Sequence, residues 1–192
     1  MSKRPHASFE DPDGPRRTDA PLDWVVENLP LIRPGGRVLD IACGSGRHLR
    51  AALQAGFQVT GIDRDVAGVH DIAGRPGVRL IEADLETGVT PPFVTERFDG
   101  VIVTNYLWRP LLAAIVAAVA EDGVLIYETF AAGNERHGRP ARPEFLLQPG
   151  ELIAAVTGKL VVVAYRHGRR DDPHPSVRQA IAAVGPRHAA LV

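Results

Sequence analysis

The stretch Arg37-Val-Leu-Asp-Ile-Ala-Cys-Gly-Ser-Gly-Arg47 decides the fold of this 192-residue chain. Its first part, Arg37 to Ala42, is mostly apolar and predicts a buried strand that breaks at a turn containing two glycines. The residues from Arg47 to Ala55 then carry apolar side chains at helical spacing, and Gly56 suits the end of a helix. A buried strand, a glycine turn and a helix are therefore expected in direct succession.

The same alternation continues along the chain. Further strands are predicted at residues 57–63, 78–84, 98–105, 124–130 and 160–167, and a last apolar segment covers 177–184. Helices are predicted around residues 24–32 and at 47–55, 66–73, 110–120 and 151–156. Strands that alternate with helices favour an α/β fold, a Rossmann-like, doubly wound and mostly parallel sheet with helices on both faces.

The composition is that of a single globular domain. Hydrophobic residues make up 45% of the chain and the formal net charge is −1, so no overall field would attract nucleic acid or a membrane. Residues 1–21 are polar, predicting a flexible tail without a signal peptide, and residues 22–192 form one domain. The longest apolar run, 111–120, is shorter than the roughly 20 residues of a membrane span. A single cysteine, Cys43, excludes a cysteine-built metal site and fits a reducing cytoplasm. We therefore expect a soluble, cytoplasmic protein without a metal, and its preference for Arg over Lys fits a bacterial genome rich in GC.

Polar side chains end the first four predicted strands. These residues are Asp40, Asp63, Asp84 and Asn105. Ligands of doubly wound sheets bind beyond the carboxyl ends of the strands, whereas polar side chains stacked in a core would be costly. The turn at Gly44-Ser-Gly46 directs backbone N–H groups to the same edge. The sequence therefore predicts a polar ligand site at this edge.

Two classes of ligand compete for such a site. NAD or FAD would use the same edge, as in a dinucleotide-dependent oxidoreductase. However, the dinucleotide fingerprint needs a third small residue where this chain has Leu49. In addition, a carboxylate at Asp40 would repel a pyrophosphate but attract the ammonium and sulfonium groups of S-adenosylmethionine. Asp63 fits either ligand as an acceptor for ribose hydroxyls.

These motifs resemble those of class I S-adenosylmethionine-dependent methyltransferases. The similar segments are Val38–Gly46, Asp63, Glu82–Leu85, Phe98–Leu107 and Pro110–Glu128. The resemblance covers roughly Trp24 to Phe130 and continues in outline to the end of the chain. Within this family, the chain most resembles small stand-alone bacterial methyltransferases of the tellurite-resistance and thiopurine types.

The resemblance implies a seven-stranded sheet with an antiparallel last strand, and S-adenosyl-L-methionine as the cofactor, with S-adenosyl-L-homocysteine as its product. Asp40 and the backbone of the glycine turn would hold the methionine part, Asp63 the ribose and Asp84 the adenine. Asn105 and Tyr106 would close the pocket beside the methyl group. The complete set implied for the cofactor is Asp40, Ala42, Cys43, Gly44, Gly46, Asp63, Arg64, Asp84, Leu85 and Asn105.

Methyl transfer from a sulfonium is an in-line displacement, so alignment and desolvation can supply much of the catalysis. A soft nucleophile needs little further help, whereas an oxygen nucleophile usually needs a general base. The candidates for catalysis are His48, Tyr106 and Glu128. Alternatively, His48 is a solvated residue of the first helical turn and Tyr106 only packs. Cys43 is interpreted as a packing residue rather than a nucleophile.

The methyl acceptor is expected to be a small molecule. Tyr106 would line its pocket, and Trp108 would either line the pocket mouth or pack against the following helix. Arg139 and Arg142 would bind an anionic group together with further basic residues after the fifth strand. Those further residues are Arg166, His167, Arg169 and Arg170, of which the last two are better explained as a solvated surface loop. Nucleic acid is a less favoured substrate, tRNA included, because the chain has no room for a separate binding module. A non-catalytic protein that binds S-adenosylmethionine is a further alternative.

Overall fold

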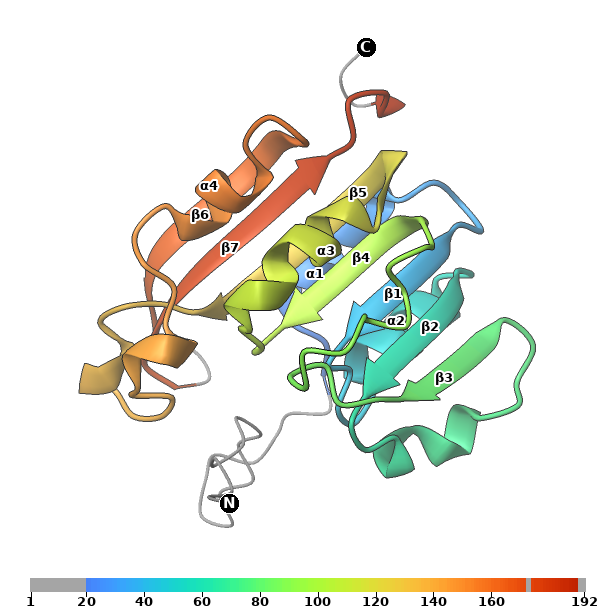
Figure 1. The fold of residues 1–192 in the computed structure, drawn as a ribbon, viewed down its shortest axis with the longest axis horizontal. Coiled ribbons are helices and arrows are strands. Elements are labelled where there is room, and N and C mark those ends of the chain that lie inside the picture. Colours follow the sequence, from blue (N-terminus) through green and yellow to red (C-terminus); the bar gives the residue numbers. More distant parts are fainter. Residues whose placement is uncertain (1–19, 172–173, 190–192) are drawn as a thin grey trace.

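The computed structural model describes residues 20–171 and 174–189, so most of the predicted tail, residues 1–19, lies outside the described residues. In the described part, one seven-stranded sheet runs through the centre in the order β3-β2-β1-β4-β5-β7-β6 (Figure 1). The strands are β1 (Arg37–Ile41), β2 (Gln58–Asp63), β3 (Val78–Glu82), β4 (Phe98–Thr104), β5 (Val119–Phe130), β6 (Val161–Arg170) and β7 (Ser176–Val184). The first five strands are parallel, and β7 lies antiparallel between β5 and β6. The predicted fold class is confirmed.

Four α-helices of the described chain cover the two faces of the sheet (Figure 1). On one face, α1 (Asp23–Asn28) and α2 (Arg47–Gln54) bury Trp24 and Leu49 against the sheet. On the other face, α3 (Leu112–Ala117) and α4 (Glu151–Val156) bury Ile115 and Leu152. Successive strand side chains alternate between the two faces, and the apolar strands therefore contribute to both cores.

Short 3₁₀ turns connect several elements. They are η1 (Leu29–Leu31), η2 (Ala67–Ile72), η3 (Arg109–Leu111), η4 (Asn134–Arg136) and η5 (Pro143–Phe145). Residues 66–73 were predicted as a helix, and the structure has the 3₁₀ turn η2 there. Gly68 packs against the backbone of Ser45, and the segment buries only Val69 and Ile72. The tertiary contact with the glycine turn replaces a regular helix with this tighter turn.

The fifth strand begins earlier than predicted, and the preceding helix is correspondingly shorter. Val119 pairs with Phe98, and the ladder resumes after a bulge with Val124 opposite Gly100. A Cβ on Gly123 would approach the Phe98 carbonyl oxygen to 2.7 Å, so glycine permits the two backbones to lie this close. Asp122 and Gly123, which lie between the predicted helix and the predicted strand, are therefore part of an irregular strand.

The sixth strand is longer than predicted, since β6 continues to Arg170. Arg169 and Arg170 pair with Val177 and Ser176 of β7. Their placement in a surface loop was therefore wrong, because antiparallel pairing with β7 extends the strand. Among the described residues, no helix is long and apolar enough to span a membrane.

Candidate functional site

Asp40 lies near the carboxyl end of β1, between Gly61 of β2 and Ile102 of β4. Its side chain is only 1% exposed, and neither carboxylate oxygen has a hydrogen-bond partner in the described structure. Burial raises the pKa of Asp40 to about 8, and the charge of Asp63 adds to this effect. The positive charge of Arg47 offsets part of it, and the backbone N–H of Leu49, which does not make a full hydrogen bond to Asp40, lowers the pKa least. A buried carboxylate without a partner is costly, which is the condition that a bound cation would relieve.

The turn after Asp40 has a left-handed backbone at three positions. The φ angles are 56° at Ala42, 52° at Gly44 and 75° at Gly46. The N–H of Gly44 donates to Asp63 Oδ2 at 2.7 Å, which joins the turn to the end of β2. A Cβ on Gly46 would overlap Val69, so glycine is required there for space as well as for conformation.

Cys43 lies within the same turn and packs into the core. Its side chain is 6% exposed, and its N–H donates to the carbonyl of Ile62 at 3.1 Å. Burial raises the pKa of the thiol, so the reactive thiolate is disfavoured. These contacts agree with a packing role for the side chain.

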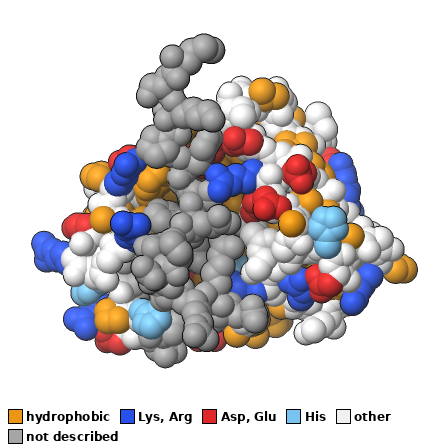
Figure 2. All heavy atoms as spheres, turned by 90° about the horizontal axis from the view of Figure 1, so that it is seen from below, with side chains coloured by type: hydrophobic (Ala, Val, Ile, Leu, Met, Phe, Trp, Pro, Cys, Tyr) orange, Lys and Arg blue, Asp and Glu red, His pale blue; other side chains and the backbone are white. Residues whose placement is uncertain are grey.

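Two further carboxylates follow the neighbouring strands β2 and β3. Asp63 is half-buried and also accepts from the N–H of Asp65 at 3.2 Å, while the adjacent Arg64 is exposed. Asp84 is exposed and accepts from the N–H of Glu86 at 2.9 Å, and Leu85 packs against the core. Asp40, the glycine turn, Asp63 and Asp84 therefore lie at or just after the carboxyl ends of three adjacent strands, as predicted. Acidic and basic side chains both lie on the face seen from below (Figure 2).

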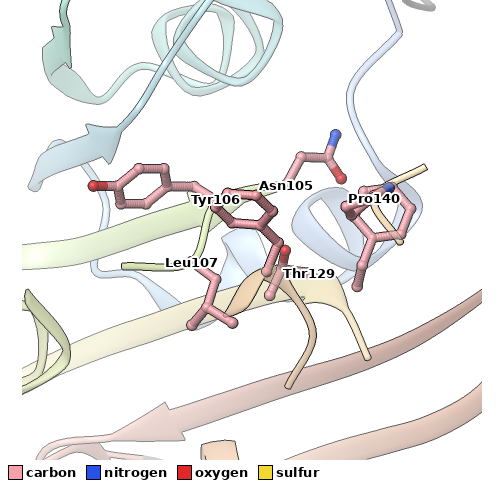
Figure 3. A pocket seen from close by; sticks show the side chains of 7 residues that line it. Asn105, Tyr106, Leu107, Thr129 and Pro140 are labelled. Carbon is pink, nitrogen blue, oxygen red and sulfur yellow. The ribbon is translucent and has the colours of Figure 1, made fainter. Parts of the chain in front are cut away.

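A pocket lies where β4 and β5 end (Figure 3). It is lined by Asn105, Tyr106, Leu107, Thr129, Phe130, Pro140 and Phe145. Asn105 has a φ of 53°, a conformation that Asn tolerates better than most residues. The hydroxyl of Tyr127 donates to the backbone carbonyl of Tyr106 at 2.9 Å and anchors the segment after β4. Trp108 is half-buried and packs against the core instead of lining this pocket.

The hydroxyl of Tyr106 is buried and has no hydrogen-bond partner in the described structure. In Figure 3 the ring of Tyr106 points away from Pro140. Burial raises the pKa of this phenol, and the carboxylates of Glu86 and Asp84 raise it further. The hydroxyl therefore stays protonated and is available to donate to a ligand between the acidic residues and the pocket.

His48 lies in the first turn of α2 and is buried. Its Nε2 accepts from the N–H of Leu22 at 3.2 Å, so its Nδ1 carries the proton and donates to Thr104 Oγ1 at 3.2 Å. Burial, with a smaller effect from Arg47, lowers the pKa of His48 to about 3. A ring with both nitrogens occupied and so low a pKa is unsuited to act as a general base, and the alternative of a solvated residue is also wrong.

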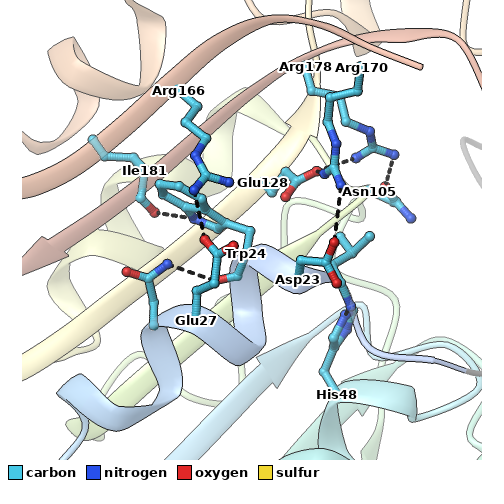
Figure 4. Close-up of polar contacts among 12 residues, drawn as sticks. Asp23, Trp24, Glu27, His48, Asn105, Glu128, Arg166, Arg170, Arg178 and Ile181 are labelled. Atoms are coloured by element: carbon cyan, nitrogen blue, oxygen red, sulfur yellow. Dashed lines mark hydrogen bonds and ion pairs between the residues drawn. The ribbon is translucent and has the colours of Figure 1, made fainter. Parts of the chain in front are cut away.

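Glu128 lies near the end of β5 and is 1% exposed. Two guanidinium groups converge on its Oε1, Arg170 at 2.6 Å and Arg178 at 3.3 Å (Figure 4). Arg178 also donates to Asn105 Oδ1 at 2.7 Å and lies over the ring of Phe130 at 4.0 Å. Glu128 is therefore the buried counter-ion of two arginines through Oε1, whereas its Oε2 is buried without a hydrogen-bond partner among the described residues. The two ion pairs disfavour its prediction as a general base.

Arg178 is the site residue that sequence reasoning missed. It lies in β7, in a segment interpreted as one more apolar strand, and its position as a lone cation there was the available signal.

The predicted basic residues do not gather into one patch. Arg139 and Arg142 are exposed, and Arg142 lies 3.7 Å from Glu144. Arg166 instead stacks over Trp24 at the other side of α1.

Comparisons with known proteins agree with this geometry. A family model described as a methyltransferase domain matches residues 38–123. No curated protein matches the chain by sequence. Solved structures with the same fold include TehB from Haemophilus influenzae, with a TM-score of 0.67 and 17% identity. The match to TehB covers 84% of this chain but only 61% of that chain.

Two other similar structures carry further information. The 1,6-didemethyltoxoflavin-N1-methyltransferase of Burkholderia thailandensis was solved with S-adenosylhomocysteine and has a TM-score of 0.62 at 19% identity. That match covers 85% of this chain and 78% of the other. A TehB-like S-adenosylmethionine-dependent methyltransferase from Corynebacterium glutamicum has a TM-score of 0.56 and 22% identity, covering 82% and 86% of the two chains. The family match shows a methyltransferase domain over residues 38–123, and the solved structures show that the chain shares the fold of S-adenosylmethionine-dependent methyltransferases.

Proposed function

We propose that this protein transfers a methyl group from S-adenosylmethionine to a small-molecule acceptor. One observation carries the proposal: Asp40 is a buried carboxylate with no hydrogen-bond partner in the described structure, and it directly precedes the glycine turn. S-adenosylmethionine carries an ammonium and a sulfonium, so it would supply the positive charge that this carboxylate needs.

The residues at the edge of the sheet fit the rest of the cofactor. Asp40 and the turn from Ala42 to Gly46 would hold the methionine part. Asp63, already ordered by the N–H of Gly44, would accept from the ribose hydroxyls, and Asp84 with Leu85 would contact the adenine. This assignment uses carboxylates as hydrogen-bond acceptors and needs no phosphate-binding group.

The dinucleotide alternative is less consistent with these residues. Leu49 is fully buried, and a Cβ on Gly61 would approach Leu49 Cδ1 to 2.5 Å, so the side chain fills the space beside β2. The third small residue of the dinucleotide fingerprint, which lets the helix pack closely on the strand, is therefore missing. Asp40, when ionised, would also oppose two phosphate charges, whereas a cationic ligand stabilises its ionised form.

The cofactor supplies an activated methyl group on its sulfonium. The protein would contribute mainly alignment and exclusion of water, because both ring nitrogens of His48 and Oε1 of Glu128 are engaged in other contacts. Asn105 and Tyr106 follow β4 and line the pocket, and they would orient the acceptor. An acceptor that is already nucleophilic at neutral pH fits this arrangement best.

The acceptor is proposed to be small because the pocket is enclosed by only a few side chains at the ends of β4 and β5. One structural neighbour, an N1-methyltransferase, was solved with its namesake compound 1,6-didemethyltoxoflavin bound, which supports a small acceptor here. A non-catalytic protein that senses the cofactor would bind S-adenosylmethionine equally well, so turnover is the discriminating property.

Thermal shift assays with S-adenosylmethionine, S-adenosylhomocysteine, NAD and FAD test the cofactor. The two S-adenosyl compounds should stabilise the protein increasingly with concentration, and NAD and FAD should not. Asp40→Asn should lose this response, whereas Glu121→Gln, which changes an exposed carboxylate paired with Arg187, should keep it. Release of S-adenosylhomocysteine in a screen of small acceptors then tests catalysis. Stabilisation by NAD alone would overturn the proposal.

A further inference from the structure

The amide of Asn105 has a fixed orientation. Arg178 Nη2 donates to Asn105 Oδ1 at 2.7 Å. A guanidinium can only donate hydrogen bonds, so the atom facing Arg178 has to be the oxygen. The NH₂ group of Asn105 is therefore the part left for a ligand, and Asn105 is exposed where it lines the pocket. At this wall the pocket thus offers a ligand the donor end of the amide, while the amide oxygen is engaged by Arg178.

The group of charges behind this wall has an excess of positive charge. Arg170 and Arg178 both contact Oε1 of a single buried carboxylate, Glu128. A further carboxylate, Asp23, is largely exposed and lies 4.0 Å from Arg170, so water weakens its effect. Burial lowers the pKa of Arg178 to about 10, with further lowering by Arg170 and Arg47, so Arg178 is still charged at neutral pH.

Arg178 is connected directly to the pocket. It contacts two lining residues, through the hydrogen bond to Asn105 and through its position over the ring of Phe130. Its side chain is 12% exposed, so its charge is poorly screened by water. The remaining walls are largely apolar and include Leu107, Pro140 and Phe145. The NH₂ group of Asn105, a hydrogen-bond donor, and the positive charge of Arg178 therefore border an otherwise largely apolar pocket.

We propose that the acceptor is a small carboxylate with an apolar body, whose anionic oxygen accepts from the NH₂ group of Asn105 beside Arg178. Asn105 contacts the ligand, and Arg178 is a positioning residue that fixes the amide and adds positive charge. This inference rests on the proposed function and narrows it, because an amine beside Asn105 Oδ1 would meet the guanidinium of Arg178, which already donates to that oxygen. The recognised carboxylate need not be the atom that receives the methyl group.

Benzoate and benzamidine provide a direct test, since they share one ring and carry opposite charges. Isothermal titration of each probe into the protein saturated with S-adenosylhomocysteine should give a Kd for benzoate at least about tenfold lower than for benzamidine. Equal affinities, tighter binding of benzamidine, or no binding of benzoate would overturn the inference. Failure of S-adenosylhomocysteine to bind in the first titration would instead refute the proposed function.

Two variants test the roles of the residues. Asn105→Asp keeps an oxygen for Arg178 but replaces the NH₂ group with a second oxygen, and Asp also tolerates the left-handed backbone at this position. The preference for benzoate should disappear.

Arg178→Gln should reduce the same preference by freeing the amide to rotate. Arg169→Gln, a control at an exposed ion pair with Asp171, should leave the preference unchanged. The ratio of the two affinities is the readout, because a purely structural defect would weaken both probes equally. An unchanged ratio in Asn105→Asp would contradict the proposed contact.

Discussion

The cofactor affinity should depend on pH through Asp40. In the free protein, burial raises the pKa of this carboxyl to about 8, so the group is mostly protonated at neutral pH. A cationic cofactor binds the ionised form, and binding near neutral pH therefore has to displace a proton from Asp40. As pH rises towards 8, a larger fraction of Asp40 is already ionised in the free protein, so removal of its proton costs less of the binding free energy.

The size of the effect follows from the pKa. Below it, each pH unit reduces the ionised fraction about tenfold, equivalent to about 1.4 kcal/mol of binding free energy. With a pKa of about 8, the apparent Kd for S-adenosylmethionine should fall roughly 25-fold between about pH 6.5 and about pH 8.5. The change should level off above the pKa, where Asp40 is already ionised.

Isothermal titration at a series of pH values, in buffers of different ionisation enthalpy, measures both the Kd and the protons released. The wild-type protein should release close to one proton per cofactor near pH 6.5, and fewer above the pKa. Asp40→Asn has the same shape without the charge, so its affinity should be weak and nearly independent of pH. A wild-type affinity that is flat over this range, or one that weakens as pH rises, would refute the assignment of Asp40 as the cation-binding carboxylate.

Three further substitutions test the surroundings of the site. The pKa of His48 is about 3 in the folded protein and ordinary in the unfolded chain. Its contribution to folding stability is therefore present above about pH 6.5 and is lost as pH falls towards 3. His48→Ala should remove this pH dependence from urea unfolding and should lower the free energy of unfolding by about 1–3 kcal/mol near neutral pH. Glu128→Gln should lower the free energy of unfolding by about 3 kcal/mol, since two guanidiniums lose their buried counter-ion, and an unchanged midpoint in urea would contradict the ion-pair account. Gly46→Ala should destabilise the protein by roughly 1–3 kcal/mol through its φ of 75° and its overlap with Val69, and should weaken S-adenosylhomocysteine binding more than the exposed control Gly138→Ala.

The first four strands could be predicted from the sequence because their signals are local. Each is a short apolar run ended by a polar residue, and the glycine turn after Asp40 separates strand from helix within a few positions. The later strands depend on partners far away in the chain. The early start of β5 at Val119 needs the bulged pairing with Phe98, and the extension of β6 to Arg170 needs the ladder with β7. Neither partner can be identified from the local pattern.

The acidic edge of the site was predicted for the same reason, since Asp40, Asp63 and Asp84 all follow strands. The environment of His48 and Glu128 was not predictable in this way. His48 is buried by contacts with Leu22 and Thr104, which are far from it in sequence. Glu128 meets Arg178 only because β7 lies beside β5 in antiparallel register. A side chain's chemical type is local, whereas its partner is set by the topology of the sheet.

A crystal structure of the protein with S-adenosylhomocysteine tests the role of Asp40 most directly. We expect the ammonium of the ligand within hydrogen-bonding distance of the Asp40 carboxylate, with its ribose hydroxyls on Asp63. S-adenosylhomocysteine bound away from the turn after β1, or with its carboxylate rather than its ammonium facing Asp40, would contradict this assignment.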